Sequence, residues 1–277
     1  MISFKDLFNL KGYEVYIIGG NGLIGSQIVR ALQEFGASIT VFDIDIKEKK
    51  NNKTTKYVKF NCANEKNIKN FFSKYIKKNK CPDVFINASY PVTKDWKKNT
   101  FTEINFNSYK KNIELHLNSY VWIAKTIADQ MQKKNIHGSI IQLSSMYGLV
   151  AQDDNLYKKT NVSENMTYGI IKSSTIHFTK QMASHYGKYN IRVNNLVIGG
   201  IKGHIKGSKK KQDKYFLKKQ LDIIEPNVIF CSQDTFDAYK HIYDSVLIKI
   251  NNNCFKHNER LIINFYHPSY GFMKGGR

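Results

Sequence analysis

Residues 13–25 read YEVYIIGGNGLIG, and this stretch decides the fold. The part up to Ile18 is a short apolar run typical of a buried strand, and a glycine-rich turn follows it directly. From Ile24 to Leu32, apolar residues recur at helical spacing. Glycines let a backbone turn sharply against a pyrophosphate, and the N–H groups at a helix N-terminus stabilise an anion. The stretch therefore predicts a strand, a phosphate-binding turn and a helix.

Strand and helix signals alternate along the rest of the chain. This alternation predicts an α/β fold, a single Rossmann-type doubly wound parallel β-sheet with helices on both faces. Further strands are expected at Ser38–Phe42, Tyr57–Cys62, Asp83–Ile86, Ser139–Leu143, Ile191–Ile198 and Leu261–Phe265. Helices are expected at Glu65–Ile76, Phe106–Lys134 and Thr235–Ile248, and around Tyr168. No repeat or linker divides the sequence.

An acidic residue, Asp43, follows the second expected strand directly. A carboxylate at this point is placed to bind both hydroxyls of an adenosine ribose, and it would repel the 2′-phosphate of NADP. NAD is therefore the expected cofactor, in preference to NADP. Asn87 and Ala88, after the fourth strand, either border the adenosine or stabilise the turn. One NAD(P)-binding Rossmann domain is expected over residues 1–277.

The chain is strongly basic, with 43 Lys and Arg against 22 Asp and Glu and a formal net charge of +21. The lysines are spread among asparagine and isoleucine, so a nucleic acid is not the expected partner, although any basic surface attracts polyanions. Only Lys202–Lys219 is concentrated, with eight lysines against the single acid Asp213. Two interpretations stay open: a solvated surface, or a lid over residues 200–225 that attracts a phosphorylated substrate.

The four cysteines, Cys62, Cys81, Cys231 and Cys254, form neither a close pair nor a metal-ligand spacing. We therefore expect a reducing compartment and no metal site. The apolar runs are shorter than a membrane span needs, and nothing resembles a secretion signal. No membrane association is expected, and the predicted location is cytoplasmic.

Three polar residues are candidates for catalysis. Ser145 follows the strand that begins at Ser139, at the edge of the sheet where open α/β folds bind ligands. Tyr168 and Lys172 lie four residues apart and so project from one face of a helix. An ammonium beside a phenol favours the phenolate, which can act as a base near neutral pH. In a chain with 17 tyrosines this pair has meaning only together with the upstream glycine turn.

The order of these motifs, over about residues 12–200, resembles the short-chain dehydrogenase/reductase family. The resemblance implies catalytic roles for Ser145, Tyr168 and Lys172. It implies that the cofactor contacts Gly19, Asn21, Gly22, Leu23, Ile24, Gly25, Asp43, Asn87, Ala88, Ser89, Tyr168, Lys172 and Gly199. The chain departs from the family pattern at Ile18, Ser89 and Ile198, where threonine, glycine and proline are usual.

Two features narrow the resemblance. The interval from Ser145 to Tyr168 is longer than in most members, and His116 stands where most have an asparagine. With Tyr90 and the proline after it, these features resemble flagellin modification protein A-like oxidoreductases of bacterial surface-sugar pathways, including those of nonulosonic acids. A sugar, sugar phosphate or nucleotide sugar would then be the substrate, bound by Tyr90, Ser145, Tyr147 and Gly200. In the alternative interpretation, Tyr90 and Tyr147 only pack within the protein and do not line the substrate pocket.

The resemblance implies hydride transfer between NAD and a sugar hydroxyl or its ketone, with Tyr168 as the base and Ser145 holding the substrate oxygen. His116 is either a proton relay, and so catalytic, or a buried core group. Two alternatives remain: a nucleotide-sugar epimerase or dehydratase of the extended branch, and a catalytically weak NAD-binding scaffold or polyanion-binding protein. The resemblance also implies a homodimer or homotetramer.

Overall fold

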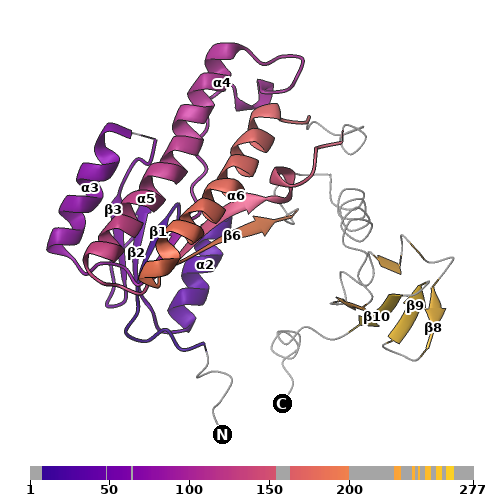
Figure 1. The fold of residues 1–277 in the computed structure, drawn as a ribbon, viewed down its shortest axis with the longest axis horizontal. Helices are drawn as coiled ribbons and strands as arrows, with labels where there is room; N and C mark the ends of the chain where they lie inside the picture. Colours follow the sequence, from indigo (N-terminus) through magenta and orange to yellow (C-terminus); the bar gives the residue numbers. More distant parts are fainter. Residues whose placement is uncertain are drawn as a thin grey trace, which may run out of the picture. The chain divides into compact units, whose positions relative to one another are not determined.

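The computed structural model describes residues 8–47, 49–63, 65–153 and 163–199, and further along the chain residues 228–231, 239, 240, 243, 247–250, 254–257 and 260–264. Contacts divide the chain into two compact units. One unit comprises residues 1–153 and 163–198, and the other comprises residues 154–162 and 199–277. Most of the described residues belong to the first unit (Figure 1).

A six-stranded sheet forms the centre of the first unit. Its strands are β1 (Glu14–Ile18), β2 (Ser38–Asp43), β3 (Thr55–Lys59), β4 (Val84–Asn87), β5 (Ser139–Ser145) and β6 (Arg192–Ile198). The spatial order is β3-β2-β1-β4-β5-β6, and every pairing is parallel. The strand order reverses between β1 and β4, and open α/β folds bind their ligands at the carboxyl ends of the strands at such a point. The predicted doubly wound parallel sheet is confirmed.

Helices cover both faces of this sheet, as predicted (Figure 1). Helix α2 (Leu23–Glu34) packs on one face, whereas α3 (Glu65–Lys78), α5 (Asn118–Lys133) and α6 (Met166–Tyr186) pack on the other. Along β1 the side chains alternate, with Ile17 toward α2 and Ile18 toward the other three helices. Short 3-10 turns occur at η1 (Trp96–Lys98), η3 (Met146–Gly148) and η5 (Gly187–Tyr189).

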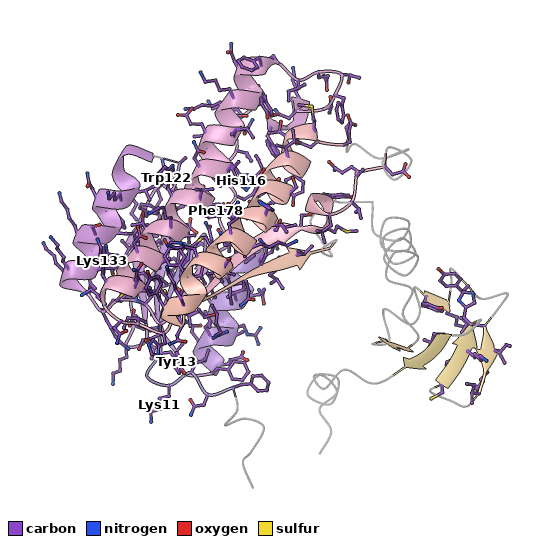
Figure 2. All side chains as sticks on the ribbon, viewed as in Figure 1. Lys11, Tyr13, His116, Trp122, Lys133 and Phe178 are labelled. Atoms are coloured by element: carbon purple, nitrogen blue, oxygen red, sulfur yellow. The ribbon has the colours of Figure 1, made fainter. Side chains whose placement is uncertain are left out.

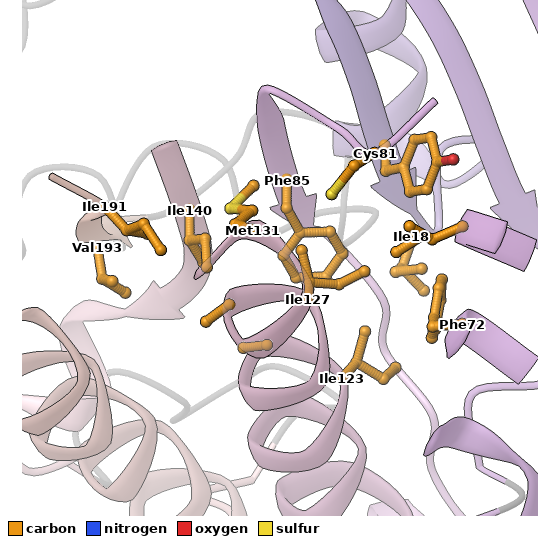
Figure 3. Close-up of a cluster of buried hydrophobic side chains, with 14 of the residues drawn as sticks. Ile18, Phe72, Cys81, Phe85, Ile123, Ile127, Met131, Ile140, Ile191 and Val193 are labelled. Atoms are coloured by element: carbon orange, nitrogen blue, oxygen red, sulfur yellow. The ribbon is translucent and has the colours of Figure 1, made fainter. Parts of the chain in front are cut away.

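The larger core lies between the sheet and the three helices, and Figure 3 shows part of it. Phe72 of α3, Phe85 of β4 and Ile123 of α5 are fully buried there. Burying a side chain of this size stabilises the fold by about 1.5–3 kcal/mol. The hydroxyl of Tyr186 on α6 donates to Asp129 of α5 over 2.7 Å. This packing fixes the positions of α5 and α6, and hence of the polar side chains that they carry.

The long helix predicted over residues 106–134 is not uniform. It consists of α4 (Phe106–Asn112), a π-helical turn η2 (Ile113–Leu117) and α5. A π turn widens a helix locally and often occurs at functional sites. His116 lies within this turn and is fully buried. Apolar periodicity predicts the helix but carries no signal for the change of helix type.

The glycine turn between β1 and α2 leaves no room for side chains at two of its positions. Gly19 has a φ of 74°, and a β-carbon added to it would lie 2.8 Å from the carbonyl oxygen of Ala88. A β-carbon added to Gly25 would overlap the carbonyl oxygen of Gly19. Only glycine fits at these two positions, because each neighbour is backbone.

The second unit contains a separate four-stranded sheet in the order β7-β10-β9-β8. Its strands are β7 (Val228–Cys231), β8 (Ile248–Lys249), β9 (Cys254–His257) and β10 (Arg260–Asn264). The predicted last strand therefore exists as β10, but it pairs with β9 in antiparallel register. Ile248 begins β8, so the helix predicted to end at this residue ends before it. The single domain over residues 1–277 stays a prediction, and the proposed lid over residues 200–225 lies outside the described residues.

We expect Gly25→Ala to lower the free energy of unfolding by about 1–3 kcal/mol, because the added methyl group meets backbone that cannot move independently. Gly187→Ala is the matched control: a β-carbon there has no atom within 4 Å, and Gly187 has a φ of −56°. The control should change the same quantity by less than about 0.5 kcal/mol. Urea denaturation monitored by circular dichroism measures both. Equal losses in the two variants would contradict the packing argument.

Candidate active site

The glycine turn lies beside the end of β2. The backbone N–H of Asn21 donates to Oδ2 of Asp43 over 2.9 Å, and the N–H of Gly19 donates to the carbonyl oxygen of Phe42 over 2.8 Å. Nδ2 of Asn21 also donates to the carbonyl oxygen of Asp45 over 2.6 Å. These bonds hold the predicted ribose-binding acid next to the predicted pyrophosphate-binding turn.

The N-terminus of α2 is suited to an anion. Gly22 precedes the helix with an extended backbone and makes no side-chain capping bond to it. The N–H groups of the first turn, which begins at Leu23 and continues through Ile24 and Gly25, have no acceptor within the helix. Such a terminus attracts phosphate groups through these N–H groups and through the helix dipole.

The turn after β4 is held by the side chain of Asn87. Its Oδ1 accepts hydrogen bonds from the N–H and the hydroxyl of Ser89, over 3.2 and 2.7 Å. The hydroxyl of Tyr120 donates to the carbonyl oxygen of Ser89 over 2.8 Å. Asn87 therefore stabilises the turn, which was one of the two sequence interpretations. Its Nδ2 is buried and has no hydrogen-bond partner within the described residues, so a donor remains for a bound group.

The two serines at the end of β5 have different partners. The hydroxyl of Ser144 donates to the carbonyl oxygen of Lys172 over 2.9 Å and so ties the strand to α6. The hydroxyl oxygen of Ser145 accepts the N–H of Tyr147 in η3 over 3.3 Å. Ser145 is the acceptor in this bond, so its hydroxyl proton is available to another oxygen. The hydroxyl proton of Ser144 is instead used in the bond that connects β5 to α6.

Helix α6 brings Tyr168 and Lys172 to the end of β5. Asn165 caps the helix, since its Oδ1 accepts the N–H of Tyr168 over 2.8 Å. A β-carbon added to Gly148 of η3 would lie 2.7 Å from the carbonyl carbon of Lys172. The turn that carries Tyr147 therefore lies directly against the helical turn that carries both predicted catalytic residues.

Lys172 is an ammonium group in a buried setting, with 3% of the residue exposed. Its Nζ donates to the carbonyl oxygen of Leu143 over 3.1 Å and lies 3.4 Å from Nε2 of His116. The Nζ also lies 4.8 Å from the ring centroid of Tyr120 and 5.7 Å from that of Tyr168. Burial lowers the pKa of Lys172 from 10.5 to about 7. Near neutral pH the charged and neutral forms thus have similar free energies, so the group can both donate and recover a proton.

His116, labelled in Figure 2, approaches Lys172 from the π-helical turn, with 3.4 Å between Nε2 and Nζ. Burial, and next the charge of Lys172, lower the pKa of His116 well below its ordinary value. The imidazole is therefore neutral and accepts from Lys172 through Nε2, which leaves the proton on Nδ1. That Nδ1 is buried and lacks a hydrogen-bond partner among the described residues. His116 therefore contacts the predicted catalytic lysine, as a relay requires.

Three aromatic rings surround the ring of Tyr168. The centroids of Tyr90, Trp96 and Tyr147 lie 6.1, 6.3 and 6.3 Å from its centroid, with interplanar angles of 66°, 84° and 70°. Tyr90 also lies 5.1 Å from the ring of His116. Tyr90 is 49% exposed although it belongs to this cluster. The cluster gives the region around Tyr168 largely aromatic walls.

The loop that carries Trp96 is bonded to the catalytic helix by buried polar groups. Asn99 is fully buried, and its Oδ1 accepts the hydroxyl of Thr167 over 2.8 Å. Its Nδ2 donates to the hydroxyl oxygen of Ser108 over 2.9 Å. Nδ2 of Asn165, the cap of α6, donates to the carbonyl oxygen of Trp96 over 3.0 Å. Leaving any one of these buried partners unsatisfied costs about 1–3 kcal/mol, so the loop is held firmly.

Sequence patterns did not identify Trp96, Asn99 or Tyr120. Tyr120 had one available signal, because it comes one helical turn after His116 and so shares its face. No sequence signal pointed to Trp96 or Asn99, because their partners belong to α6, which lies far along the chain. Gly199 comes directly after β6 and belongs to the second unit, and Gly200 lies outside the described residues. Their predicted roles stay predictions.

Two other kinds of site are absent from the part of the chain that the structure describes. Within it, no group of three or more His, Cys, Asp or Glu side chains is arranged to hold a metal ion. None of the helices in the described ranges has the length and apolar character needed to cross a membrane.

Comparison with known proteins gives a consistent result. The family model described as enoyl-(acyl carrier protein) reductase matches residues 21–222. Over 141 residues the chain is 35% identical to the post-translational flagellin modification protein A of Campylobacter coli. That match covers 51% of this chain and 52% of the relative, so the chain spans about half of that protein's length.

Two further similarities cover more of the chain. The NADH-dependent L-xylulose reductase of Ambrosiozyma monospora is 24% identical over 220 residues, which cover 73% of this chain and 77% of that protein. The crystal structure of a short chain dehydrogenase from Leptospira borgpetersenii with bound NAD⁺ has a TM-score of 0.68. The structural match covers 78% of this chain and 81% of that one at 24% identity, and it supports the fold.

The buried setting of Lys172 predicts a pH-dependent stability. Because its pKa falls from 10.5 to about 7 on folding, the unfolded chain binds more protons between these values. The free energy of unfolding should therefore rise with pH there, by at most about 1.4 kcal/mol per pH unit. Lys172→Met should lack this rise, which urea denaturation from pH 7 to about pH 9.5 measures.

The exposed lysine Lys180, on the same helix, provides the matched control. Lys180→Met should keep the pH dependence of the unsubstituted protein. If the free energy of unfolding changes with pH in the same way in Lys172→Met and in the unsubstituted protein, the argument for the buried ammonium fails.

Proposed function

The chain belongs to the short-chain dehydrogenase/reductase family, and on that premise we propose that it transfers hydride between NAD and a sugar hydroxyl or the corresponding ketone. The observation that carries the proposal is the position of Lys172, buried beside the imidazole of His116 and behind the ring of Tyr168. Family membership supports oxidoreductase chemistry, and the aromatic surroundings of Tyr168 support a small organic substrate.

The residues at the carboxyl ends of β1, β2 and β4 fit a dinucleotide. Gly22 opens the N-terminus of α2 to a pyrophosphate, and the contact at Gly19 lets backbone approach it closely. Asp43 stands beside this turn, where it would bind the adenosine ribose hydroxyls. The Nδ2 of Asn87, which has no hydrogen-bond partner in the described part of the chain, would donate to the cofactor. Asn21, Leu23, Ile24, Gly25, Ala88, Ser89 and Gly199 complete the proposed contacts. When bound, NAD would supply the acceptor or donor of the hydride.

The proposed mechanism assigns a step to each polar side chain. Tyr168, as phenolate, would take the proton of the substrate hydroxyl. The charge of Lys172 favours this phenolate, and Lys172 would also bind the nicotinamide ribose. Ser145 would donate to the substrate oxygen and stabilise the charge that develops on it. His116 would carry protons between Lys172 and solvent, which its neutral imidazole permits.

Relatives support a sugar as substrate. One is named for flagellin modification and another for reduction of L-xylulose. We therefore include a sugar, sugar phosphate or nucleotide sugar in the proposal, together with a role in bacterial surface-glycan biosynthesis such as flagellin modification or nonulosonic acid synthesis. Tyr90, Ser145 and Tyr147 would contact this substrate.

A homodimer or homotetramer in the cytoplasm completes the proposal. Trp122 projects from α5 and is 48% exposed, which a subunit contact would explain (Figure 2). Within the described residues Cys62 and Cys81 form no disulfide, which is compatible with the proposed reducing compartment.

A panel of sugars, sugar phosphates and nucleotide sugars tests the reaction, with formation of NADH monitored by absorbance. Tyr168→Phe should lower kcat by about 100-fold or more, because it removes the general base, and NAD binding should persist. Tyr57→Phe is the matched control, since Tyr57 lies on β3 at the sheet edge. Undiminished turnover in Tyr168→Phe would refute the mechanism. Turnover without net consumption of NAD would instead indicate an epimerase.

Cofactor choice gives a second test. Asp43→Asn should raise the ratio of kcat/KM with NADP to that with NAD by about tenfold or more, because it removes a charge that repels the 2′-phosphate. Asp45→Asn, two residues later and exposed, should leave the ratio within about twofold. An unchanged ratio in Asp43→Asn would show that this carboxylate does not select the cofactor.

A further inference from the structure

Trp96 and Tyr90 form a pair at the edge of the aromatic cluster. Their ring centroids lie 6.0 Å apart at an interplanar angle of 89°. Nε1–H of Trp96 donates to the hydroxyl oxygen of Tyr90 over 3.1 Å. The bond fixes the two rings relative to each other. It also leaves the hydroxyl proton of Tyr90 free to be donated outward, because the Tyr90 oxygen acts as the acceptor.

The pair is held at a fixed place relative to Tyr168. The carbonyl oxygen of Trp96 accepts from Nδ2 of Asn165, whose Oδ1 in turn accepts the N–H of Tyr168. Asn99, three residues after Trp96, bonds to Thr167. Two residues just before Tyr168, Asn165 and Thr167, thus anchor the loop that carries Trp96. A ligand that lies on Trp96 has a set position relative to the Tyr168 phenol.

The exposure of Tyr90 and Trp96 indicates that this pair does more than pack within the protein. Tyr90 is 49% exposed and Trp96 is partly exposed, whereas the core residue Tyr120 behind them is 1% exposed. Large aromatic groups that line a site supply apolar contact area and a few directed polar groups. Here the directed group is the hydroxyl of Tyr90.

A cyclic sugar matches these groups. One face of a pyranose ring presents C–H bonds, which the negative face of an aromatic ring attracts, and its edge presents hydroxyl groups. An open-chain polyol has no persistent C–H face, and it would lose more conformational freedom on binding. The arrangement therefore favours a ring over a chain.

We infer that the ring of Trp96, held perpendicular to Tyr90, stacks on the C–H face of a pyranose and so determines which ring hydroxyl meets Tyr168. This inference rests on the proposed function and adds the substrate class to it. Trp96 is a specificity-determining residue of the site, and Tyr90 orients it.

The chain has two tryptophans, Trp96 and Trp122, which permits a direct test. In the double variant Trp122→Phe, Tyr168→Phe, Trp96 is the only source of tryptophan fluorescence and hydride transfer is blocked. With saturating NAD⁺, this variant is titrated with L-fucose and with uridine diphosphate glucose as pyranose probes. D-arabinitol is the open-chain probe, and uridine diphosphate alone is the control for the nucleotide. Trp96→Phe, Tyr168→Phe, in which only Trp122 emits, is the matched control.

We expect a saturable change in Trp96 emission with at least one pyranose, no change with D-arabinitol, and no change in Trp122 emission. By calorimetry, Trp96→Ala should weaken binding of that pyranose roughly three- to tenfold, as loss of one stacking contact implies. Trp96→Phe, which keeps a ring, should weaken it by less than about threefold. Tyr90→Phe should weaken it less than Trp96→Ala does.

Three results would overturn the inference. The first is that Trp96→Ala binds the pyranose as tightly as the protein that keeps Trp96. The second is that Trp96→Ala weakens binding of D-arabinitol as much as binding of the pyranose. The third is that neither pyranose changes the Trp96 emission. An unchanged dissociation constant for NAD⁺ in Trp96→Ala shows that this variant is folded. Failure of the proposed function is a different outcome: the unsubstituted protein would form no NADH with any sugar of the panel, whether or not a pyranose changes the Trp96 emission.

Discussion

The contact between Gly25 and Gly19 is the constraint on which the rest of the structure depends. Helix α2 can begin directly after β1 only because its first turn lies against backbone, with no β-carbon between them. This brings the helix N-terminus to the carboxyl end of β1, where the strand order reverses between β1 and β4. The anion-binding groups and the chemistry at the end of β5 therefore meet along one edge of the sheet. A side chain at Gly25 would therefore disturb the turn that we propose to bind the dinucleotide.

At that edge the structure stabilises an arrangement that is unfavourable by itself. An ammonium group at Lys172 loses hydration when it is buried, and its partners are a carbonyl oxygen, an imidazole nitrogen and two aromatic rings. The large core under α5 and α6 provides the free energy that this burial costs. The outcome is a lysine whose pKa lies near 7, next to the tyrosine whose ionisation it influences. Such perturbed groups are typical of catalytic sites.

The π-helical turn and the loop before α4 adapt a common fold to a particular site. The π turn places His116, in place of the family's asparagine, against Nζ of Lys172. The loop holds the indole of Trp96 beside Tyr168 through hydrogen bonds of the side-chain amides of Asn165 and Asn99. Both features use fully buried polar side chains, namely His116 in the π turn and Asn99 and Thr167 at the loop, and such groups fix position only when their hydrogen bonds are made. Substrate preference would then depend on this loop, whereas cofactor binding depends on the glycine turn.

The sequence by itself determined the first unit: its strands, its glycine turn, its acid at the end of β2 and the spacing of Tyr168 and Lys172. These are local properties, because periodicity, glycine conformation and helical spacing act over a few neighbouring residues. Only the tertiary structure decided that Ser144 serves packing, that His116 lies in a π turn and that Trp96 stands beside Tyr168. It also decided that β10 joins a mixed sheet in the second unit. Those outcomes depend on contacts between residues far apart in the chain. A local sequence pattern carries no information about the free energy of such contacts.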